Sequence, residues 1–557
     1  MTASVFPDPP HPTVHDAFVA AARAYANRPF LRILPETAGH YGIPAGDLRY
    51  GDALDAVEAL RARYAAAGYG PGHRAGLLLE NRPAFFLHWL ALNGLGVSVV
   101  PIGPELRSAE LQYLIGHSEI SLAVVLHHRV TDLQAAADAV GAALAVITAE
   151  HEGAIPSPAR PALTGLPSGL EAECALMYTS GTTGRPKGCV LTNRYYLQAG
   201  AWYLGLGGLC AIRPGEDVLV TPLPMHHMNA MAFSTLVMVM SGGCVVPLDR
   251  FHPRTWWDAV READATIVHY LGVMPPMLMG APASEADRAH RVRFGFGAGV
   301  DRKLHAAFEA RFGFPLVEAW AMTETGAGGV VIAHEELRHV GTACFGRAPA
   351  ELEVLLVDDA GKPVGADTNG ELLVRAAGPD PRRGFFREYL KDPEATAEAW
   401  RDGWFHTGDV VRSDADGYLY FVDRKKNVIR RSGENIAAVE VESVLRQHPV
   451  VAQVAVAATP DPVRGDEVLA CIVPNALVAA ECREAIARDL VEHCLAQLAY
   501  FKAPGYVAFV EALPLTASQK IQRGELKALA ATLPGQPHVV DTRALKRRSG
   551  PPATSQT

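Results

Sequence analysis

The sequence predicts an α/β fold: a large N-terminal domain of helix-covered, mostly parallel sheets with a small β-barrel-like module, then a small α+β C-terminal domain. Three observations predict it. Strand-like runs alternate with helix-length segments in the first half of the chain, and the pattern changes near residue 347 and again near residue 423. The 557 residues also exceed what one hydrophobic core usually spans, so several compact units are expected.

The alternation begins at residue 50. Tyr50–Ala67 and residues 84–95 carry apolar residues at helical spacing, whereas residues 74–80 and 97–101 have the pattern of short buried strands. This order is typical of parallel sheets covered by helices. The apolar run 230–240 is too short to cross a bilayer and is predicted to be a buried core helix. Further strands are expected at residues 217–220, 243–247 and 265–268.

The second half of the chain has a different pattern of predicted elements. Between residues 347 and 422, short strands are separated by Asp-Gly and Gly-Lys-Pro turns, which predicts a small antiparallel or barrel-like module. We place the N-terminal domain at residues 1–422 and a mobile C-terminal domain at 423–557, with polar residues from Lys546 onward expected to be frayed. In that domain we expect helices at 438–448 and 484–498, and strands at 451–457 and 468–473.

Composition excludes several classes of protein. Apolar residues make up 49% and charged residues 20% of the chain, which is ordinary for a folded protein. A net charge of −9 argues against a general nucleic-acid binder, although a local basic patch could hold a phosphorylated ligand. The eight cysteines form no C-x-x-C pair, so they predict neither a zinc site nor a redox dithiol. Without a signal-peptide pattern, membrane span or peroxisomal address, a cytoplasmic protein is expected.

A glycine-rich segment, Tyr178-Thr-Ser-Gly-Thr-Thr-Gly-Arg-Pro-Lys187-Gly, follows a predicted strand end. Glycines let backbone N–H groups approach phosphate oxygens, and a lysine adds positive charge. The loop is not a Walker A motif, because Gly188 rather than Ser or Thr follows Lys187. Phosphate-binding candidates are Thr179, Ser180, Gly181, Thr182, Thr183, Gly184 and Lys187.

The order of these residues resembles the acyl-adenylate-forming superfamily, which comprises acyl-CoA synthetases, luciferases and peptide-synthetase adenylation domains. Further family-like segments follow in order along the chain, from about residue 50 to 527. These are Leu-Pro-Met-His-His at 223–227, Gly-Ala-Gly-Val at 297–300, Glu-Ala-Trp-Ala-Met-Thr-Glu at 318–324, Asp-Gly-Trp-Phe-His-Thr-Gly-Asp at 402–409, Asp-Arg-Lys-Lys at 423–426, Arg-Arg-Ser-Gly-Glu-Asn-Ile at 430–436 and the lysine segment 513–526.

The resemblance implies roles at the nucleotide. Asp409 binds the ribose hydroxyls, Arg424 reaches the ribose, and Thr323 contacts the α-phosphate. Glu324 holds Mg²⁺, a cation that prefers carboxylate and phosphate oxygens. Trp320 takes the position that stacks on adenine, where the family usually has Tyr or Phe. The remaining adenine-side residues implied by the resemblance are Gly297, Ala298, Gly299, Glu318 and Ala319.

It also implies roles elsewhere. Lys520 is the catalytic lysine, although Gln519 replaces the usual preceding glycine. Lys426 is the hinge for rotation of the C-terminal domain. The turn Ser432, Gly433 and Glu434 faces the CoA channel. The acyl pocket is assigned to His227, Met228, Trp320 and Ala321, and His226 stands where Phe is common.

The resemblance implies an acyl-CoA synthetase that uses ATP, CoA and Mg²⁺ and binds a small carboxylic acid, with a homodimer suggested by the family alone. The segment 432–436 looks most like carnitine/crotonobetaine and medium-chain CoA ligases. Two alternatives stay open: an enzyme that loads a carrier protein instead of CoA, and an inactive binding homologue. The joint presence of Lys187, Glu324, Asp409, Arg424 and Lys520 opposes the second.

Overall fold

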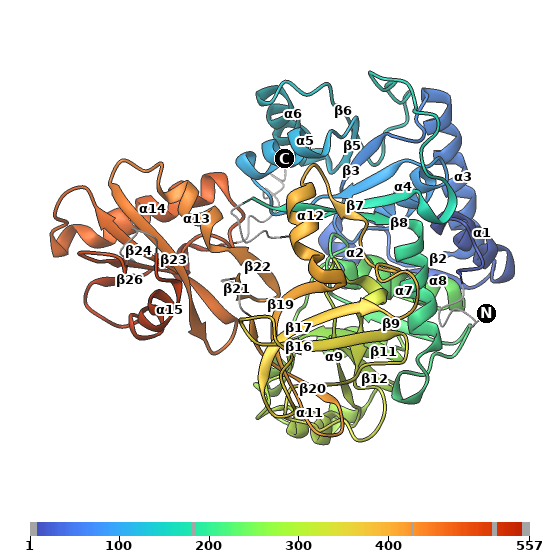
Figure 1. Ribbon diagram of the computed structural model, residues 1–557. Coiled ribbons are helices and arrows are strands. Elements are labelled where there is room, and N and C mark those ends of the chain that lie inside the picture. The colour runs from blue at the N-terminus through green and yellow to red at the C-terminus, as the bar shows by residue number, and fades with distance from the viewer. Residues whose placement is uncertain (1–7, 180–184, 425–427, 515–520, 548–557) are drawn as a thin grey trace.

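The computed structural model describes residues 8–179, 185–424, 428–514 and 521–547. They form a large lobe, residues 8–424, and a small lobe, residues 428–547, which lies to one side of it (Figure 1). The buried apolar clusters divide in the same way, because none of them combines residues from both lobes. No helix in these ranges is long and apolar enough to cross a membrane. The predicted boundary between residues 422 and 423 stays a prediction.

A seven-stranded sheet forms one layer of the large lobe, and its central strands pair in parallel. They are buried along nearly their whole length, as expected for parallel strands covered on both faces. The strands, in spatial order, are β18 (Glu388–Tyr389), β8 (Lys187–Thr192), β7 (Glu173–Thr179), β4 (Ser98–Pro101), β3 (Arg74–Leu78), β5 (Leu122–Val125) and β6 (Ala145–Thr148).

An eight-stranded sheet forms a second layer. Its inner strands are parallel and only the edge strands pair antiparallel. The strands predicted at 217–220, 243–247 and 265–268 all belong to it, each within two residues of its expected start. In spatial order they are β14 (Val331–Ile332), β13 (Leu316–Trp320), β12 (Phe294–Ala298), β11 (Ile267–Leu271), β9 (Val218–Thr221), β10 (Cys244–Pro247), β1 (Pro29–Ile33) and β2 (Gly46–Arg49).

Helices connect the strands of both sheets. Tyr50–Ala67 is a helix as predicted, and it ends at Gly68, whose φ of 94° few other residues adopt. The predicted helix at 84–95 spans Pro83–Asn93, with proline at its first turn. The α-helices of this lobe are α1 (Val14–Ala24), α2 (Pro35–Tyr41), α3 (Tyr50–Ala67), α4 (Pro83–Asn93), α5 (Ser108–Ser118), α6 (Val130–Ala139), α7 (Asn193–Gly205), α8 (Thr235–Ser241), α9 (Trp256–Glu262), α10 (Met274–Met279), α11 (His305–Phe312) and α12 (Pro393–Ala399).

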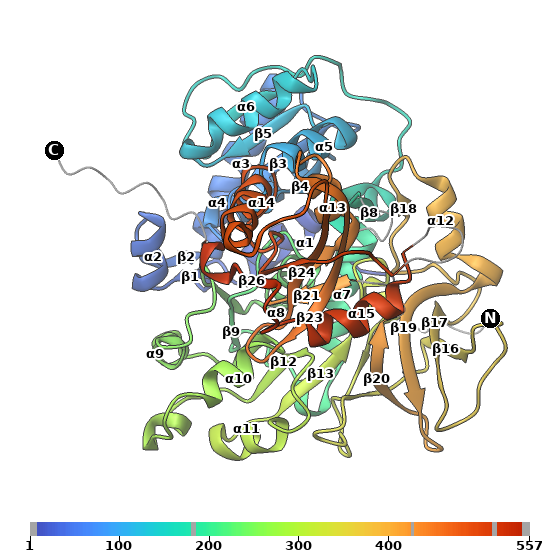
Figure 2. The same ribbon diagram turned by 90° about the vertical axis from the view of Figure 1, so that its left-hand side faces the viewer.

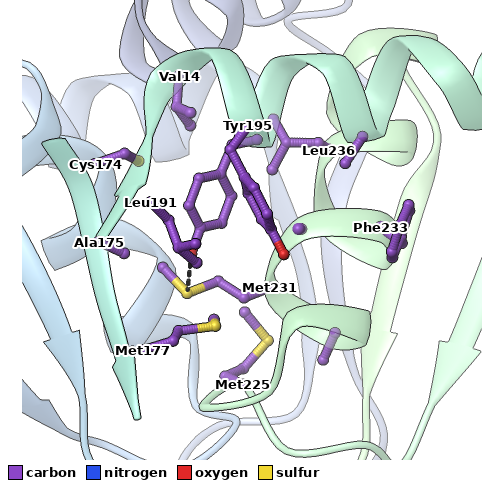
Figure 3. Packing of buried hydrophobic residues seen from close by; sticks show 14 of the residues in the cluster. Val14, Cys174, Ala175, Met177, Leu191, Tyr195, Met225, Met231, Phe233 and Leu236 are labelled. Carbon is purple, nitrogen blue, oxygen red and sulfur yellow. Dashed lines mark hydrogen bonds between the residues drawn. The ribbon is translucent and has the colours of Figure 1, made fainter. Parts of the chain in front are cut away.

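The apolar run at 230–240 is buried as predicted, but it is not one regular α-helix. Asn229–Ser234 is a π-helix that continues into α8. The hydroxyls of Ser234 and Thr235 donate to the carbonyl oxygens of Asn229 and Ala230, five residues earlier, which supports the wider turn. Figure 3 shows this segment packed against side chains from β7, β8 and α7. π-Turns are frequent at functional sites, and this one lies beside a cavity described below.

The module predicted from residue 347 is a five-stranded antiparallel sheet. Between β17 and β19 the chain passes out of this sheet. There β18 pairs with β8 of the seven-stranded sheet, so the five-stranded module is part of the large lobe. The five strands, in spatial order, are β15 (Cys344–Arg347), β20 (Tyr418–Arg424), β19 (Phe405–Ser413), β17 (Asn369–Ala376) and β16 (Leu352–Val357).

The small lobe is an α+β unit with its own apolar core, and Figure 2 views the molecule from its side. All four elements predicted between residues 438 and 498 form within a few residues of their expected limits. Its strands are β21 (Val428–Arg431), β22 (Glu434–Ala437), β23 (Val451–Asp461), β24 (Gly465–Pro474), β25 (Tyr506–Phe509) and β26 (Val539–Asp541), and its helices are α13 (Ala438–Leu445), α14 (Arg483–Gln497) and α15 (Arg523–Thr532).

The expectation that fraying begins at Lys546 is wrong. Lys546 is buried, and its Nζ lies 2.5 Å from Glu467 Oε1, which also contacts Arg431. Burial, and then the charge of Arg431, lower the pKa of the Lys546 ammonium to about 7, although Glu467 opposes the shift. A lysine at the start of a polar C-terminal segment is usually solvated, so the sequence carried no sign of this ion pair.

Lys546 predicts a pH dependence of stability. Its pKa is about 7 when folded, against an ordinary value of 10.5. Between these values the unfolded chain binds the extra proton, so this group contributes stability that rises with pH, at up to about 1.4 kcal/mol per pH unit. Chemical denaturation between pH 7 and 9 should show a steeper rise for the wild type than for Lys546→Met. Equal slopes would contradict the buried, weakly basic lysine.

Candidate active site

The β7–β8 hairpin presents both ends of the glycine-rich segment. Thr179 closes β7 and pairs with Lys187, which opens β8. The Lys187 Nζ lies 4.8 Å from the ring centroid of Tyr389, a distance at which a cation is attracted to the aromatic face. Ser180, Gly181, Thr182, Thr183 and Gly184, between these ends, lie outside the described residues.

Glu324 is held in place by two hydroxyl groups. Its Oε1 accepts hydrogen bonds from Thr179 Oγ1 at 3.2 Å and from the Tyr389 hydroxyl at 2.9 Å. Glu324 as a whole residue is 6% exposed, and burial together with the charge of Glu324 raises the pKa of Tyr389, so the phenol stays a donor. A second phenol, Tyr195, donates to the backbone oxygen of Thr323 at 2.9 Å. Neither tyrosine was predicted as a site residue from the sequence, because neither lies in a family-like segment.

The predicted adenine wall forms at the ends of two parallel strands. Gly297 on β12 is the register partner of Glu318 on β13. A Cβ at Gly297 would lie 2.3 Å from the carbonyl oxygen of Tyr270, so only glycine fits. The Glu318 Oε1 accepts the backbone N–H of Val300 at 2.8 Å, which fixes the loop through Ala298 and Gly299.

Trp320 and Asp409, 89 residues apart, meet directly. The indole Nε1 of Trp320 donates to Asp409 Oδ2 at 2.8 Å, and both side chains are buried. The structure therefore brings the predicted adenine residue and the predicted ribose carboxylate together. Asp409 is also the register partner of Arg424 on β20, although the Arg424 side chain is not described.

A cavity of about 280 Å³ lies beside these groups. Three of the four residues assigned to the acyl pocket, His227, Met228 and Ala321, line it. Trp320 is not among its described lining residues. Side chains alternate along β13, so Trp320 and Ala319, which borders the cavity, lie on opposite faces of the strand. Much of the wall is apolar, including Leu223, Phe233, Leu271, Phe296, Met322 and Val330.

A buried histidine supports one wall of this cavity. His269 on β11 lies within hydrogen-bonding distance of Asn229 Oδ1 at 2.7 Å and of the hydroxyl groups of Ser234 and Tyr203. Burial lowers the pKa of His269 to about 3, so the imidazole is neutral at physiological pH. This network fixes Asn229, the first residue of the π-helix and a lining residue of the cavity. The periodicity of the sequence could not identify this network, because it predicts His269 only as an ordinary strand residue.

A second cavity, of about 290 Å³, lies between the lobes. Ser432 and Glu434 of the small lobe line it, and Gly433 between them lines the first cavity. The predicted CoA-channel turn therefore sits where the cavities adjoin. The residues that line both are Thr179, Pro224, His227, Thr323 and Asn435.

A buried charge cluster joins the lobes beside this second cavity. The Lys502 Nζ lies 2.5 Å from Glu110 on α5 of the large lobe and 2.8 Å from Glu440 on α13 of the small lobe. The other oxygen of Glu110 accepts the backbone N–H of Ala499 at 2.8 Å. Burial alone would lower the pKa of the Lys502 ammonium, but the two carboxylates raise it above its ordinary value. We call Glu110, Lys502 and Glu440 the lobe latch.

Two further predicted residues, Lys426 and Lys520, lie outside the described residues. Arg523, three residues after Lys520, is described. Its guanidinium pairs with Glu442 of α13 at 2.5 Å, so the segment that follows Lys520 is anchored within the small lobe.

Comparisons with known proteins indicate the family of this chain. Residues 19–390 match the family model described as AMP-binding enzyme, and residues 440–520 match the model described as AMP-binding enzyme C-terminal domain. The chain is 30% identical over 484 residues to the crotonobetaine/carnitine–CoA ligase of Salmonella typhi, covering 83% of this chain and 89% of that protein.

Solved structures share the fold. A malonyl-CoA ligase bound to methylmalonyl-CoA and AMP superposes with a TM-score of 0.70 at 28% identity, over 88% of this chain and 97% of that one. The o-succinylbenzoate CoA synthetase of Bacillus subtilis gives 0.76 at 24% identity, over 92% and 98% of the two chains. The amide bond synthetase of Marinactinospora thermotolerans also gives 0.76, at 23% identity, over 92% and 99%. The chain belongs to the AMP-binding enzyme family.

Proposed function

We propose that this enzyme activates a carboxylic acid with ATP as an acyl-adenylate and transfers the acyl group to the thiol of CoA. The observation that carries the proposal is the junction of the two cavities. The apolar cavity reaches Thr323 and Glu324, where the family motifs put phosphate and metal, and it adjoins the cavity between the lobes at His227. An acid in the first cavity can therefore meet a thiol that arrives through the second.

In the first half-reaction a carboxylate oxygen attacks the α-phosphorus of ATP. The new P–O bond forms as the bond to pyrophosphate breaks, and negative charge gathers on the phosphates. Lys187, the backbone near Thr323 and, by resemblance, Lys520 are donors suited to stabilise that charge. The mostly apolar wall of the acid cavity would exclude water that hydrolyses the adenylate.

The donor set at Glu324 fits Mg²⁺. Mg²⁺ binds one or two carboxylates together with substrate phosphates, and Glu324 is a carboxylate whose orientation is fixed by Thr179 and Tyr389. When bound, the ion neutralises charge on the phosphates. Glu324 is the residue that would hold it.

In the second half-reaction the thiol sulfur attacks the acyl carbon. The S–H proton passes to solvent, the C–S bond forms, and the C–O bond breaks as AMP departs with the electron pair. Rotation about Lys426 would bring Lys520 to the phosphates for the first half-reaction and the turn 432–434 to the junction for the second. The lobe arrangement described above has that turn at the junction, which supports its assignment to the thiol step.

Gly433 provides a test of this assignment. Its φ is +91°, and a Cβ there would lie 2.3 Å from Leu271 Cδ1 across the lobe interface. Gly433→Val is expected to slow the CoA-dependent step at least about tenfold while adenylate formation stays within a few-fold of wild type, because the added side chain would collide with Leu271 in this lobe orientation. Strain from a β-branched residue at positive φ is shared with the control described below. Rapid-quench assays of each half-reaction measure this. Gly535→Val is the matched control, since Gly535 has the same φ of +91° and nothing within 4 Å of its added Cβ. Equal effects of the two variants would contradict the assignment.

The cavity lining points to an uncharged acyl group of moderate size. Beyond Glu324, His227 and Arg430, the described lining side chains are uncharged, and Asn229 supplies one polar contact. Pyrophosphate release should therefore favour medium-chain or aromatic acids over long-chain fatty acids, dicarboxylates and cationic acids. Faster release with a dicarboxylate or a cationic acid would contradict this substrate class.

The alternatives of a carrier-protein acceptor and an inactive homologue are tested in the same assay. The purified protein is incubated with ATP, Mg²⁺ and the preferred acid, and then with CoA or with a phosphopantetheinylated carrier protein. We expect adenylate first and acyl-CoA on addition of CoA. Adenylate that yields a thioester only with the carrier protein would replace the CoA assignment, and an absence of adenylate with every acid would support the inactive homologue.

A further inference from the structure

Three potential metal ligands converge at the junction of the two cavities. His226 and His227 follow β9 in the large lobe, and Glu434 opens β22 in the small lobe. One ligand atom from each residue lies within 4.8 Å of the other two. The ring centroids of the two histidines are 4.4 Å apart, and all three residues line the cavity between the lobes. We call these residues the junction cluster.

The spacing within the junction cluster suits a metal better than a direct hydrogen bond. The His227 Nε2 lies 3.6 Å from Glu434 Oε2, which is longer than an ordinary N–H···O contact. Two ligands of a tetrahedral zinc ion with bonds of about 2.0–2.1 Å lie about 3.4 Å from each other. Small side-chain movements would therefore place the three ligand atoms around one ion.

The donor types in the junction cluster also suit a metal. Two imidazoles and one carboxylate are a known donor set for zinc, and they leave a fourth position for water.

We propose that His226, His227 and Glu434 bind one Zn²⁺ ion that ties the small lobe to the large lobe in the orientation described here. The sequence feature behind the site is His226, which stands where the family commonly has phenylalanine. Because one ligand comes from the other lobe, the complete site exists only in this orientation. Linkage then requires that Zn²⁺ stabilise this orientation against any other by RT ln(1 + [Zn²⁺]/Kd).

Zn²⁺ binding has a consequence for turnover. The ion occupies the point where a thiol would pass toward the acid, and it opposes any rotation of the small lobe. Micromolar Zn²⁺ should therefore inhibit the complete reaction, and a chelator should restore it. This consequence rests on the proposed function, whereas binding itself does not.

The direct test is a calorimetric titration of the chelator-treated, full-length protein with Zn²⁺ in the absence of substrates. We expect one saturable site, with affinity reduced at least about tenfold in each of His226→Gln and Glu434→Gln. His252→Gln is the matched control. His252 also contacts a carboxylate, Asp249, at 3.0 Å, but it lies outside the junction cluster, so this variant should bind Zn²⁺ as the wild type does.

A second readout tests whether the ion joins the lobes. Donor and acceptor dyes on the two lobes should report a narrower distance distribution when Zn²⁺ is added, and Glu434→Gln should abolish the change. Weak multiple binding that is unaffected by Glu434→Gln would overturn the proposal, because it would mean that surface histidines alone bind the ion. No binding at all would show that the cluster is an ion pair without a metal.

Discussion

Glu324→Gln is expected to lower the rate of adenylate formation by on the order of 10²-fold or more. The amide can still accept the hydrogen bonds of Thr179 and Tyr389, so the local structure should persist. What is lost is the negative charge that would hold Mg²⁺ against the phosphates, and removal of one preorganised charge-stabilising group typically costs this much. Pyrophosphate release under single-turnover conditions measures the effect.

Tyr389→Phe is the matched control for this prediction. It removes one hydrogen bond to Glu324 but keeps the charge of Glu324 and the aromatic face beside Lys187. We expect a smaller loss than for Glu324→Gln. A Mg²⁺ titration adds a second readout, because only Glu324→Gln should raise the Mg²⁺ concentration needed for half-maximal rate. If Glu324→Gln had the wild-type rate and Mg²⁺ dependence, the assignment of Glu324 as the Mg²⁺-binding residue would be contradicted.

Lys502→Met is expected to impair the CoA-dependent step at least about 10²-fold and to leave adenylate formation within a few-fold of wild type. Without the ammonium, Glu110 and Glu440 face each other across the lobe interface as buried carboxylates. Breaking a buried ion pair by removing one partner typically costs 3–5 kcal/mol. Here the lobes can separate, which returns both carboxylates to water. The free-energy cost therefore destabilises this lobe orientation and leaves the folding of each lobe unchanged.

Charge removal distinguishes this effect from misfolding. The double variant Lys502→Met with Glu110→Gln no longer carries two facing charges, so it should recover part of the CoA-dependent rate. Thermal unfolding of the single variant should stay close to that of the wild type. If both half-reactions fell together and Glu110→Gln gave no rescue, the lobe latch would have no role in orienting the lobes.

Much of the fold was predictable because its elements have strong local signals. Tyr50–Ala67 has helical periodicity and ends at a glycine, and the parallel strands are short apolar runs between turn residues. The π-helix Asn229–Ser234 was not predictable, because hydroxyl groups that bond to carbonyl oxygens five residues earlier leave the apolar pattern unchanged. Lys546 was misjudged for a related reason: its partner Glu467 lies 79 residues earlier, and no periodicity links them.

The candidate site was predictable where a motif fixes a side chain locally. The order of motifs singled out Glu324, Asp409 and the turn 432–434. In the structure Glu324 and the turn line the cavities, and Asp409 accepts a hydrogen bond from Trp320. Tyr389 and Tyr195 were missed because they act on Glu324 and Thr323 from other elements. The lobe latch was missed because Glu110 and Lys502 lie 392 residues apart.

The central claim, that the carboxylate itself attacks ATP, is tested most directly by isotope transfer. The preferred acid, labelled with ¹⁸O in its carboxylate, is converted with ATP and CoA, and the products are analysed by mass spectrometry. Attack on the α-phosphorus followed by departure of AMP predicts one ¹⁸O atom in AMP and none in pyrophosphate. Label in inorganic phosphate together with ADP, or thioester formed without label in AMP, would contradict an adenylate intermediate.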